Sequence, residues 1–309
     1  MDPSISPELQ RTLDRHLGSS ATSVLFRWSH LSEVIGLRLA SGMEVVVKVR
    51  DWADRLEVTT RVHEAAFGLG LPCPAQLMRL ERLGEGRALS IERYEPVGEL
   101  LPRGPLLLSS SAAALAATQA TLAEIALDPS LPDPLTPVRW LDWGAGLRWP
   151  QPDDVDADLN RIDPGDWIDQ IGRDAARVLS AVDLPPVLGH GDFESSNVLY
   201  DQSGNLVMLH DWDSIVHLPE ACVAGAAALV FPANNEPYCS EVEETGRYLE
   251  AYQSQRGIEF SDEEVRCAWA AGTWQLAFNA KKELARGGPT PLGDQLAAQA
   301  DQRRAQLLD

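Results

Sequence analysis

Short apolar runs rich in Val, Leu and other strand-forming residues, broken by polar residues, occupy the first part of the chain, a pattern typical of β-strands. Turn signals such as Ser41-Gly42 separate these runs. The pattern predicts five strands, near residues 23–28, 33–40, 43–50, 76–82 and 87–93. A helix is expected over residues 7–17, and the spacing of Val58, Val62 and Leu69 predicts another over 54–69. We therefore expect a small antiparallel sheet with helices, forming an N-terminal domain over residues 1–95.

Helical periodicity replaces the strand pattern after a stretch rich in proline and glycine at 96–105. Helices are expected near residues 109–127, 166–182, 219–230, 240–256, 261–286 and 290–307. Residues 128–165 are crowded with Pro, Asp and Trp and have weak periodicity, which predicts a long irregular insertion. Short strands near 187–189 and 206–210 flank a polar loop. The chain is therefore expected to be α+β, with a larger and mainly helical domain over residues 96–309.

The charge of the chain restricts its partners. It has 309 residues with 46 acidic and 26 basic side chains, which give a formal net charge of −20. Such a surface disfavours nucleic acid and anionic membranes and favours a cationic partner. The four cysteines lack metal-ligand spacing, and the N-terminal residues lack the apolar segment of a signal peptide. We expect a cytoplasmic protein, either a monomer or a homodimer.

The polar loop between the two short strands carries the chemistry. A strand ends at Gly189, Asp192 opens the loop, Asn197 begins the return, and the next strand delivers Asp211 at its end. A hairpin of this kind brings the three polar side chains together. Phosphoryl transfer needs a carboxylate that takes the proton of the attacking hydroxyl and oxygen ligands that hold Mg²⁺. A carboxylate and a carboxamide suit Mg²⁺ rather than zinc.

Two motifs in this segment resemble a known family. His190-Gly191-Asp192 through Asn197, and His210-Asp211-Trp212-Asp213, look like the catalytic loop and metal motif of the aminoglycoside phosphotransferase and choline kinase superfamily. The resemblance spans about residues 23–285 and implies a bilobal protein-kinase-like fold. It implies that Asp192 is the catalytic base, that Asn197 and Asp211 bind magnesium, and that Asp213 assists through the metal shell or through structure. The family's later Asp-Leu-Ala is absent, because residues 217–221 read His-Leu-Pro-Glu-Ala.

The N-terminal domain offers the nucleotide-binding residues that the resemblance implies. A kinase carries a Lys on its third strand and a Glu on the following helix that holds it. Lys48 lies in the third predicted strand, and Glu64 is its expected partner, with Glu57 as a competitor. The chain has no glycine-rich phosphate loop, so the turn from Ser29 to Ser32 is expected to take that role. The expected cofactors are ATP or GTP, with Mg²⁺.

The segment between the two domains is expected to contact the nucleotide base. Glu92, Arg93 and Tyr94 lie where the inter-lobe connector should be, and Tyr94 is expected either to contact adenine or to pack in the core.

The acceptor is less specified by the sequence. Acidic residues of the C-terminal half either bind a cationic acceptor or, as we favour, lie on solvated helix faces and helix N-termini. Four tryptophans surround the insertion and form either an aromatic wall or, as we favour, the insertion's own core: Trp140, Trp143, Trp149 and Trp167. The leading hypothesis is an O-phosphotransferase acting on an aminoglycoside-like antibiotic or another small molecule. The alternatives are a metabolic kinase for choline, a sugar or an amino alcohol, and a pseudokinase.

Overall fold

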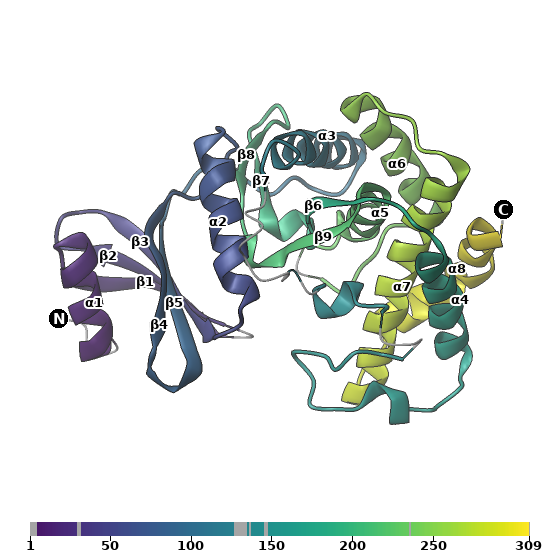
Figure 1. Cartoon of the computed structure of the whole chain (residues 1–309), viewed down its shortest axis with the longest axis horizontal. Coiled ribbons are helices and arrows are strands. Elements are labelled where there is room, and N and C mark those ends of the chain that lie inside the picture. The colour runs from purple at the N-terminus through teal and green to yellow at the C-terminus, as the bar shows by residue number, and fades with distance from the viewer. Residues whose placement is uncertain are drawn as a thin grey trace. The chain divides into compact units, whose positions relative to one another are not determined.

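The computed structural model describes residues 5–29, 32–126, 135, 137–144, 148–234 and 236–308. The chain forms two compact units, and each is described by itself (Figure 1). The first unit runs to Val97, and the second begins at Gly98 and includes the described residues from 135 onward. The predicted boundary between residues 95 and 96 lies two residues before the observed one.

The first unit is built on a five-stranded antiparallel sheet in the order β1-β2-β3-β5-β4. Its strands are β1 (Ala21–Ser29), β2 (Glu33–Leu39), β3 (Glu44–Asp51), β4 (Gln76–Leu83) and β5 (Arg87–Arg93). The helices are α1 (Pro7–Leu17), which precedes the sheet, and α2 (Arg55–Gly68), which lies between β3 and β4. These elements confirm the small antiparallel sheet with one inserted helix that the hydrophobic pattern predicts.

The two faces of this sheet differ in chemistry because successive strand residues point to opposite sides. One face is apolar and packs against Leu9 and Leu13 of α1, and residues such as Val47 belong to that core. The other face carries Lys48. Figure 1 shows α1 and α2 on opposite sides of the sheet. The polar face, which holds the candidate nucleotide lysine, is therefore the one that meets α2.

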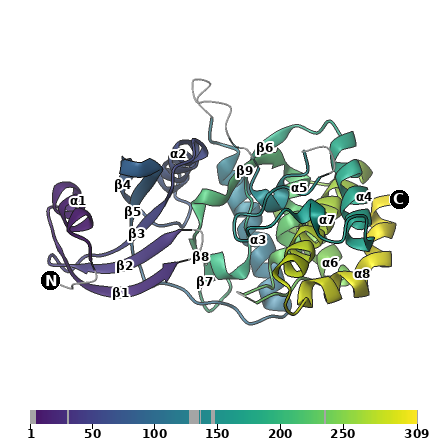
Figure 2. The same cartoon turned by 90° about the horizontal axis from the view of Figure 1, so that it is seen from below.

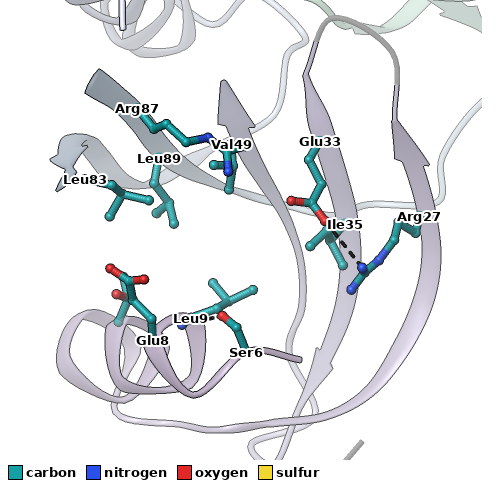
Figure 3. Close-up of a pocket in the computed structure, with 11 residues that line it drawn as sticks. Ser6, Glu8, Leu9, Arg27, Glu33, Ile35, Val49, Leu83, Arg87 and Leu89 are labelled. Atoms are coloured by element: carbon teal, nitrogen blue, oxygen red, sulfur yellow. Dashed lines mark hydrogen bonds and ion pairs between the residues drawn. The ribbon is translucent and has the colours of Figure 1, made fainter. Parts of the chain in front are cut away.

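A pocket of about 200 Å³ lies between α1 and the apolar face of the sheet (Figure 3). Its floor is apolar and includes Ile35 and Leu89, and the ion pair between Arg27 and Glu33 lies at its rim, with 3.4 Å between Nη1 and Oε1. Ile35 lies on the α1 side of the sheet, whereas Lys48 points to the α2 side. This pocket is therefore not the expected nucleotide site.

The second unit is mainly helical. Its helices are α3 (Pro105–Leu122), α4 (Trp167–Ala181), α5 (Glu220–Val230), α6 (Val242–Arg256), α7 (Asp262–Arg286) and α8 (Pro291–Leu308). The long helix α7 packs against α4, α5 and α8 (Figure 2). Helices α5 and α7 approach closely because Gly225 has no side chain; a Cβ there would overlap the carbonyl oxygen of Ala268. The predicted succession of helices is confirmed.

Four short strands make two small antiparallel pairs in this unit. They are β6 (Pro186–His190), β7 (Val198–Tyr200), β8 (Leu206–Leu209) and β9 (Ile215–Pro219). The hairpin β7–β8 was expected, but β9 was not, and it pairs with β6 along its whole length. The apolar residues Ile215, Val216 and Leu218 suit a buried strand, but no local pattern indicates that this segment pairs with β6.

Part of the insertion forms a core on α4 and α7. Trp149 is buried, and its ring stacks on that of Trp274 with centroids 4.7 Å apart. The Trp149 indole N–H donates to Asp169 at 2.7 Å, and Lys281, fully buried, lies 2.8 Å from the same carboxylate. Burial alone would raise the pKa of Asp169, but these two contacts and the Gly165 N–H outweigh it and hold the pKa below its ordinary value. The preferred interpretation of this tryptophan as core is therefore confirmed.

The four cysteines are buried free thiols. Within the described ranges, no helix combines the length and the apolar character that crossing a membrane requires.

Candidate active site

The catalytic loop begins where β6 ends, and its backbone is held on two sides. The Gly191 N–H donates to the Ser214 carbonyl oxygen at 2.8 Å, in the segment that leads into β9. A Cβ on Gly191 would lie 2.7 Å from a methyl of Val216 and 2.9 Å from the Ser214 oxygen. Only glycine permits this close approach, which explains on steric grounds why the middle residue of the His-Gly-Asp motif is glycine.

His190 links the loop to the second motif. Its ring is buried, and its Nε2 lies 2.9 Å from the His210 carbonyl oxygen, which can only accept. Its Nδ1 accepts a long hydrogen bond from the backbone N–H of Asp192 at 3.4 Å. The ring tautomer with its proton on Nε2 satisfies both contacts. His190 therefore acts as a brace that sets the position of Asp192.

Asn197 joins the two ends of the loop. Its Nδ2 donates to the backbone oxygen of Asp192 at 3.0 Å and to the Asp192 carboxylate at 3.2 Å. The backbone carbonyl oxygen of Asn197 accepts from the backbone N–H of His210 at 2.8 Å. Because the side-chain Nδ2 is used for Asp192, the side-chain oxygen Oδ1 is the atom that remains for a cation. Within the described part of the chain, Oδ1 accepts no hydrogen bond.

Asp211 occupies an unusual backbone conformation directly after β8. Its φ of 59° and ψ of 50° lie in the left-handed region, which few residues besides glycine and the short polar ones adopt. One carboxylate oxygen accepts from the Ser214 hydroxyl at 2.6 Å. Such conformations gather at functional sites because the surrounding structure has to maintain them. Asp213 follows in the short 3-10 turn Trp212–Ser214, where it is half-buried.

The loop concentrates negative charge. Burial raises the pKa of Asp192 well above its usual value, and the charges of Glu194 and Asp211 add to that rise, whereas the hydrogen bond from Asn197 and the charge of Lys282 oppose it. Burial and the charge of Asp211 likewise raise the pKa of Glu194, against the hydrogen bond from the Ser196 hydroxyl. A bound cation would relieve this repulsion. Sequence reasoning missed Glu194, although it stands inside the motif.

The donor set fits a magnesium ion that is shared with a nucleotide. No group of three or more His, Cys, Asp or Glu side chains among the described residues is arranged to hold a metal by itself. Asn197 and Asp211 instead offer two hard oxygen ligands, and Mg²⁺ in phosphoryl-transfer enzymes commonly takes its other ligands from phosphates and water. The excess of carboxylates around Asp192 agrees with such an ion.

The insertion reaches the catalytic loop through Trp140. This residue lies in the 3-10 turn Arg139–Leu141, and its indole N–H donates to the Gly191 carbonyl oxygen at 2.9 Å. The side chain of Leu141 lies beside the same glycine. Trp140 is thus neither a free aromatic wall nor part of the Trp149 core. Nothing in the sequence marks it out, because the contact joins segments 51 residues apart.

In the first unit, the structure corrects the expected partner of Lys48. Its Nζ lies 3.1 Å from Glu92 of β5. Glu64 of α2 instead accepts from Arg79 of β4 at 3.0 Å, and Glu57 is exposed. The prediction of a Lys48–Glu64 pair was therefore wrong, because Glu64 faces the sheet edge that carries Arg79.

The connector residues are also placed differently from the expectation. Glu92 and Arg93 are the last residues of β5, and the Glu92 side chain is buried against Lys48 rather than set in a connector. Tyr94 follows the strand, and its ring meets Phe26 of β1 edge to face, with centroids 5.4 Å apart. Of the two roles expected for Tyr94, packing against other side chains is therefore observed.

The serines of the expected phosphate turn lie at its two ends. Ser29 is the exposed last residue of β1, and Ser32 is half-buried just before β2. The two residues between them lie outside the described part of the chain.

Several acidic residues of the C-terminal half have local partners. Glu241 and Glu244 form the capping box of α6, and Ser261 and Glu264 form that of α7. Glu236 pairs with Arg103. The capping contacts confirm the preferred interpretation of Glu241, Glu244 and Glu264 as charges at helix N-termini, and the ion pair with Arg103 gives Glu236 a local partner.

Solved structures share the fold over nearly the whole chain. The amicoumacin kinase hAmiN, solved with AMP-PNP, Ca²⁺ and Ami, is 14% identical, with a TM-score of 0.66 over 96% of this chain and 92% of that one. Spectinomycin phosphotransferase, solved with ADP and spectinomycin, is 11% identical, with a TM-score of 0.59 over 100% and 96%. Macrolide 2'-phosphotransferase type I is 14% identical, with a TM-score of 0.54 over 99% and 98%. At such identities the likeness shows the fold.

A comparison with protein families shows the relationship itself. No curated protein sequence matches the chain. The family model described as the phosphotransferase enzyme family matches residues 17–221, which is more than half of the chain. This match confirms the resemblance drawn from the motifs around Asp192 and Asp211, and the solved structures confirm the kinase-like fold. The chain therefore belongs to the phosphotransferase enzyme family, which makes it a small-molecule kinase.

Proposed function

We propose that this enzyme transfers the γ-phosphate of ATP or GTP to a hydroxyl group of an antibiotic or antibiotic-like small molecule, with Asp192 as the base. The observation that carries the proposal is the joining of Asp192, Asn197 and the Asp211 segment by direct hydrogen bonds around one loop. A base and two metal ligands placed together are the parts that phosphoryl transfer requires.

Each residue of the loop has a task in this mechanism. The Asp192 carboxylate accepts a hydrogen bond from the acceptor hydroxyl and takes its proton as the new P–O bond forms, while the bond from the γ-phosphorus to the departing nucleoside diphosphate breaks. Asn197 keeps that carboxylate oriented through the 3.2 Å hydrogen bond. Asn197 Oδ1 and the Asp211 carboxylate would hold Mg²⁺, which when bound neutralises charge on the phosphates. In the first unit, Lys48 would contact the α- and β-phosphates.

An antibiotic or other cationic acceptor is supported by the charge of the chain, by the carboxylates of the catalytic loop and by solved structures with the same fold. The chain carries a net charge of −20, and carboxylates gather in the catalytic loop itself. Solved structures with the same fold are described as kinases or phosphotransferases of amicoumacin, spectinomycin and macrolides. A metal ion and an ammonium group would together offset the charge near Asp192. We therefore extend the small-molecule acceptor to an amine-bearing antibiotic.

The experiment that tests this function measures ADP release from MgATP and MgGTP against a panel of compounds. The panel contains aminoglycosides, macrolides, choline, amino alcohols and sugars. Turnover with an antibiotic supports the proposal, and turnover with choline, an amino alcohol or a sugar alone would move the enzyme to metabolism. Nucleotide binding without acceptor-dependent turnover on any compound would identify a pseudokinase.

The role of Asp192 has its own variant and matched control. Asp192→Asn should keep Mg-nucleotide affinity but lose turnover by about two to four orders of magnitude, because a positioned base contributes that much. Asp183→Asn makes the same charge change at an exposed position before β6 and should behave as wild type. Undiminished turnover of Asp192→Asn would remove Asp192 from the mechanism.

A further inference from the structure

Lys48 and Glu92 form an ion pair inside one sheet. In the register between β3 and β5, Lys48 is opposite Ser90 and Val46 is opposite Glu92. Lys48 and Glu92 are therefore diagonal neighbours on one face, a separation that long side chains bridge. Their charged ends are 3.1 Å apart, with only 14% and 8% of the two side chains exposed.

Helix α2 presents a different side chain to this pair. His63 is buried with its Nδ1 3.9 Å from the Glu92 carboxylate. The Gln76 amide lies 2.8 Å from that Nδ1 and 3.3 Å from the Thr60 carbonyl oxygen, to which it donates. The amide nitrogen has two hydrogens, so Nδ1 can accept the second. At the position beside Glu92, the helix thus contributes an imidazole rather than a carboxylate.

A buried thiol and a second cation lie close to the Lys48–Glu92 pair. Burial, and then the charge of Glu92, raise the pKa of the Cys73 thiol to about 12, so this thiol stays neutral. Arg50, the next cation on the same face of β3, donates to the Ser90 hydroxyl at 3.0 Å. Breaking a buried ion pair by removing one partner is costly, because the other charge stays in a poorly solvated place.

We infer that Glu92 of β5, rather than a carboxylate of α2, is the positioning residue that holds Lys48 ready for the nucleotide phosphates. This inference rests on the proposed function. Where the carboxylate lies on a helix, a shift of that helix breaks the pair and switches the kinase off. Here both partners lie on adjacent, hydrogen-bonded strands, so the register of the sheet sets their separation, and α2 contributes His63 beside Glu92 rather than the carboxylate of the pair. A shift of α2 would then leave the Lys48–Glu92 pair in place.

The test compares two variants that remove one carboxylate each, Glu92→Gln and Glu64→Gln. Calorimetry measures the affinity of each for MgADP and for adenosine, and denaturant unfolding checks that each folds. Glu92→Gln should weaken MgADP binding at least tenfold and leave adenosine binding within twofold, because Lys48 contacts phosphate and not the base. Glu64→Gln should change neither affinity. Glu92→Asp should fall between wild type and Glu92→Gln.

The outcomes separate the inference from the function it rests on. Weaker MgADP binding in Glu64→Gln with none in Glu92→Gln would return the role to α2 and overturn the inference. Equal loss of MgADP and adenosine in Glu92→Gln would also overturn it, because Glu92 would then serve the base. If Glu92→Gln does not fold, an MgADP affinity of Glu92→Asp equal to wild type overturns it. A wild-type protein that binds no nucleotide refutes the proposed function instead.

Discussion

Replacing Trp140 with phenylalanine tests how the insertion controls the catalytic loop. The substitution keeps an aromatic ring and deletes the indole N–H that donates to the Gly191 carbonyl oxygen at 2.9 Å. Gly191 is buried, and its own N–H is already bonded to the Ser214 oxygen at 2.8 Å. Without the indole donor, the Gly191 carbonyl, which directly precedes Asp192, loses the hydrogen bond that the insertion provides to orient it.

The size of the effect follows from these contacts. Leaving a buried carbonyl without its donor costs about 1–3 kcal/mol of folding free energy. Asp192 directly follows Gly191, so a carbonyl that can rotate also loosens the base. A loss of about 1.4 kcal/mol of transition-state stabilisation corresponds to a tenfold decrease in kcat. We expect a decrease of about that size, with the KM for ATP within twofold because Lys48 and the metal ligands are unchanged.

The assay is steady-state ADP release with the best acceptor of the panel, together with denaturant unfolding. Trp143→Phe is the matched control, since Trp143 is half-buried in the same segment and has no hydrogen bond through its indole in the described structure. A kcat for Trp140→Phe equal to that of Trp143→Phe would refute the reasoning. A decrease restricted to stability would show that the contact holds the insertion but does not position Asp192.

Three further predictions concern the second unit. Lys281→Met should cost about 3–5 kcal/mol of unfolding free energy at pH 7. The pKa of Asp169 is lowered, so the stabilisation from its charged form is present above about pH 4 and is lost as the pH falls through that pKa. Urea unfolding should therefore show that the destabilisation by Lys281→Met becomes smaller in acid. A destabilisation that does not depend on pH would contradict this. Gly225→Ala should destabilise by about 1–3 kcal/mol through overlap with α7, whereas thermal unfolding of Gly246→Ala, whose nearest contact would be at 3.9 Å, should show no loss. Asp211→Ala should abolish the Mg²⁺ dependence of nucleotide binding in calorimetry, and an unchanged dependence would exclude its metal role.

Local patterns were sufficient for most of the elements. The strand predicted over 87–93 is β5, and the helix predicted over 7–17 is α1, with the same bounds. Alternation and helical spacing report how each segment meets the core, and that information is contained in neighbouring residues. The strand β9 was the exception, because no partner strand was expected for it.

The catalytic loop was also largely predictable, since its members are close in sequence. Asp192 and Asn197 are five residues apart, and a hairpin brings in Asp211, so short-range geometry places them together. The motif assigns no role to the position of Glu194, so the sequence pattern does not single it out. Its influence on Asp192 depends on burial, which spacing does not express.

The sequence by itself determined the element types, the two motifs and the membership of a phosphotransferase family. Tertiary structure alone decided which side chains became partners: Glu92 rather than Glu64 for Lys48, and Trp140 for Gly191. The physical reason is that a pairing between distant segments depends on strand register and on which face each element turns toward its neighbour. Those choices are made by packing of the whole unit, whereas periodicity and spacing are properties of each segment alone.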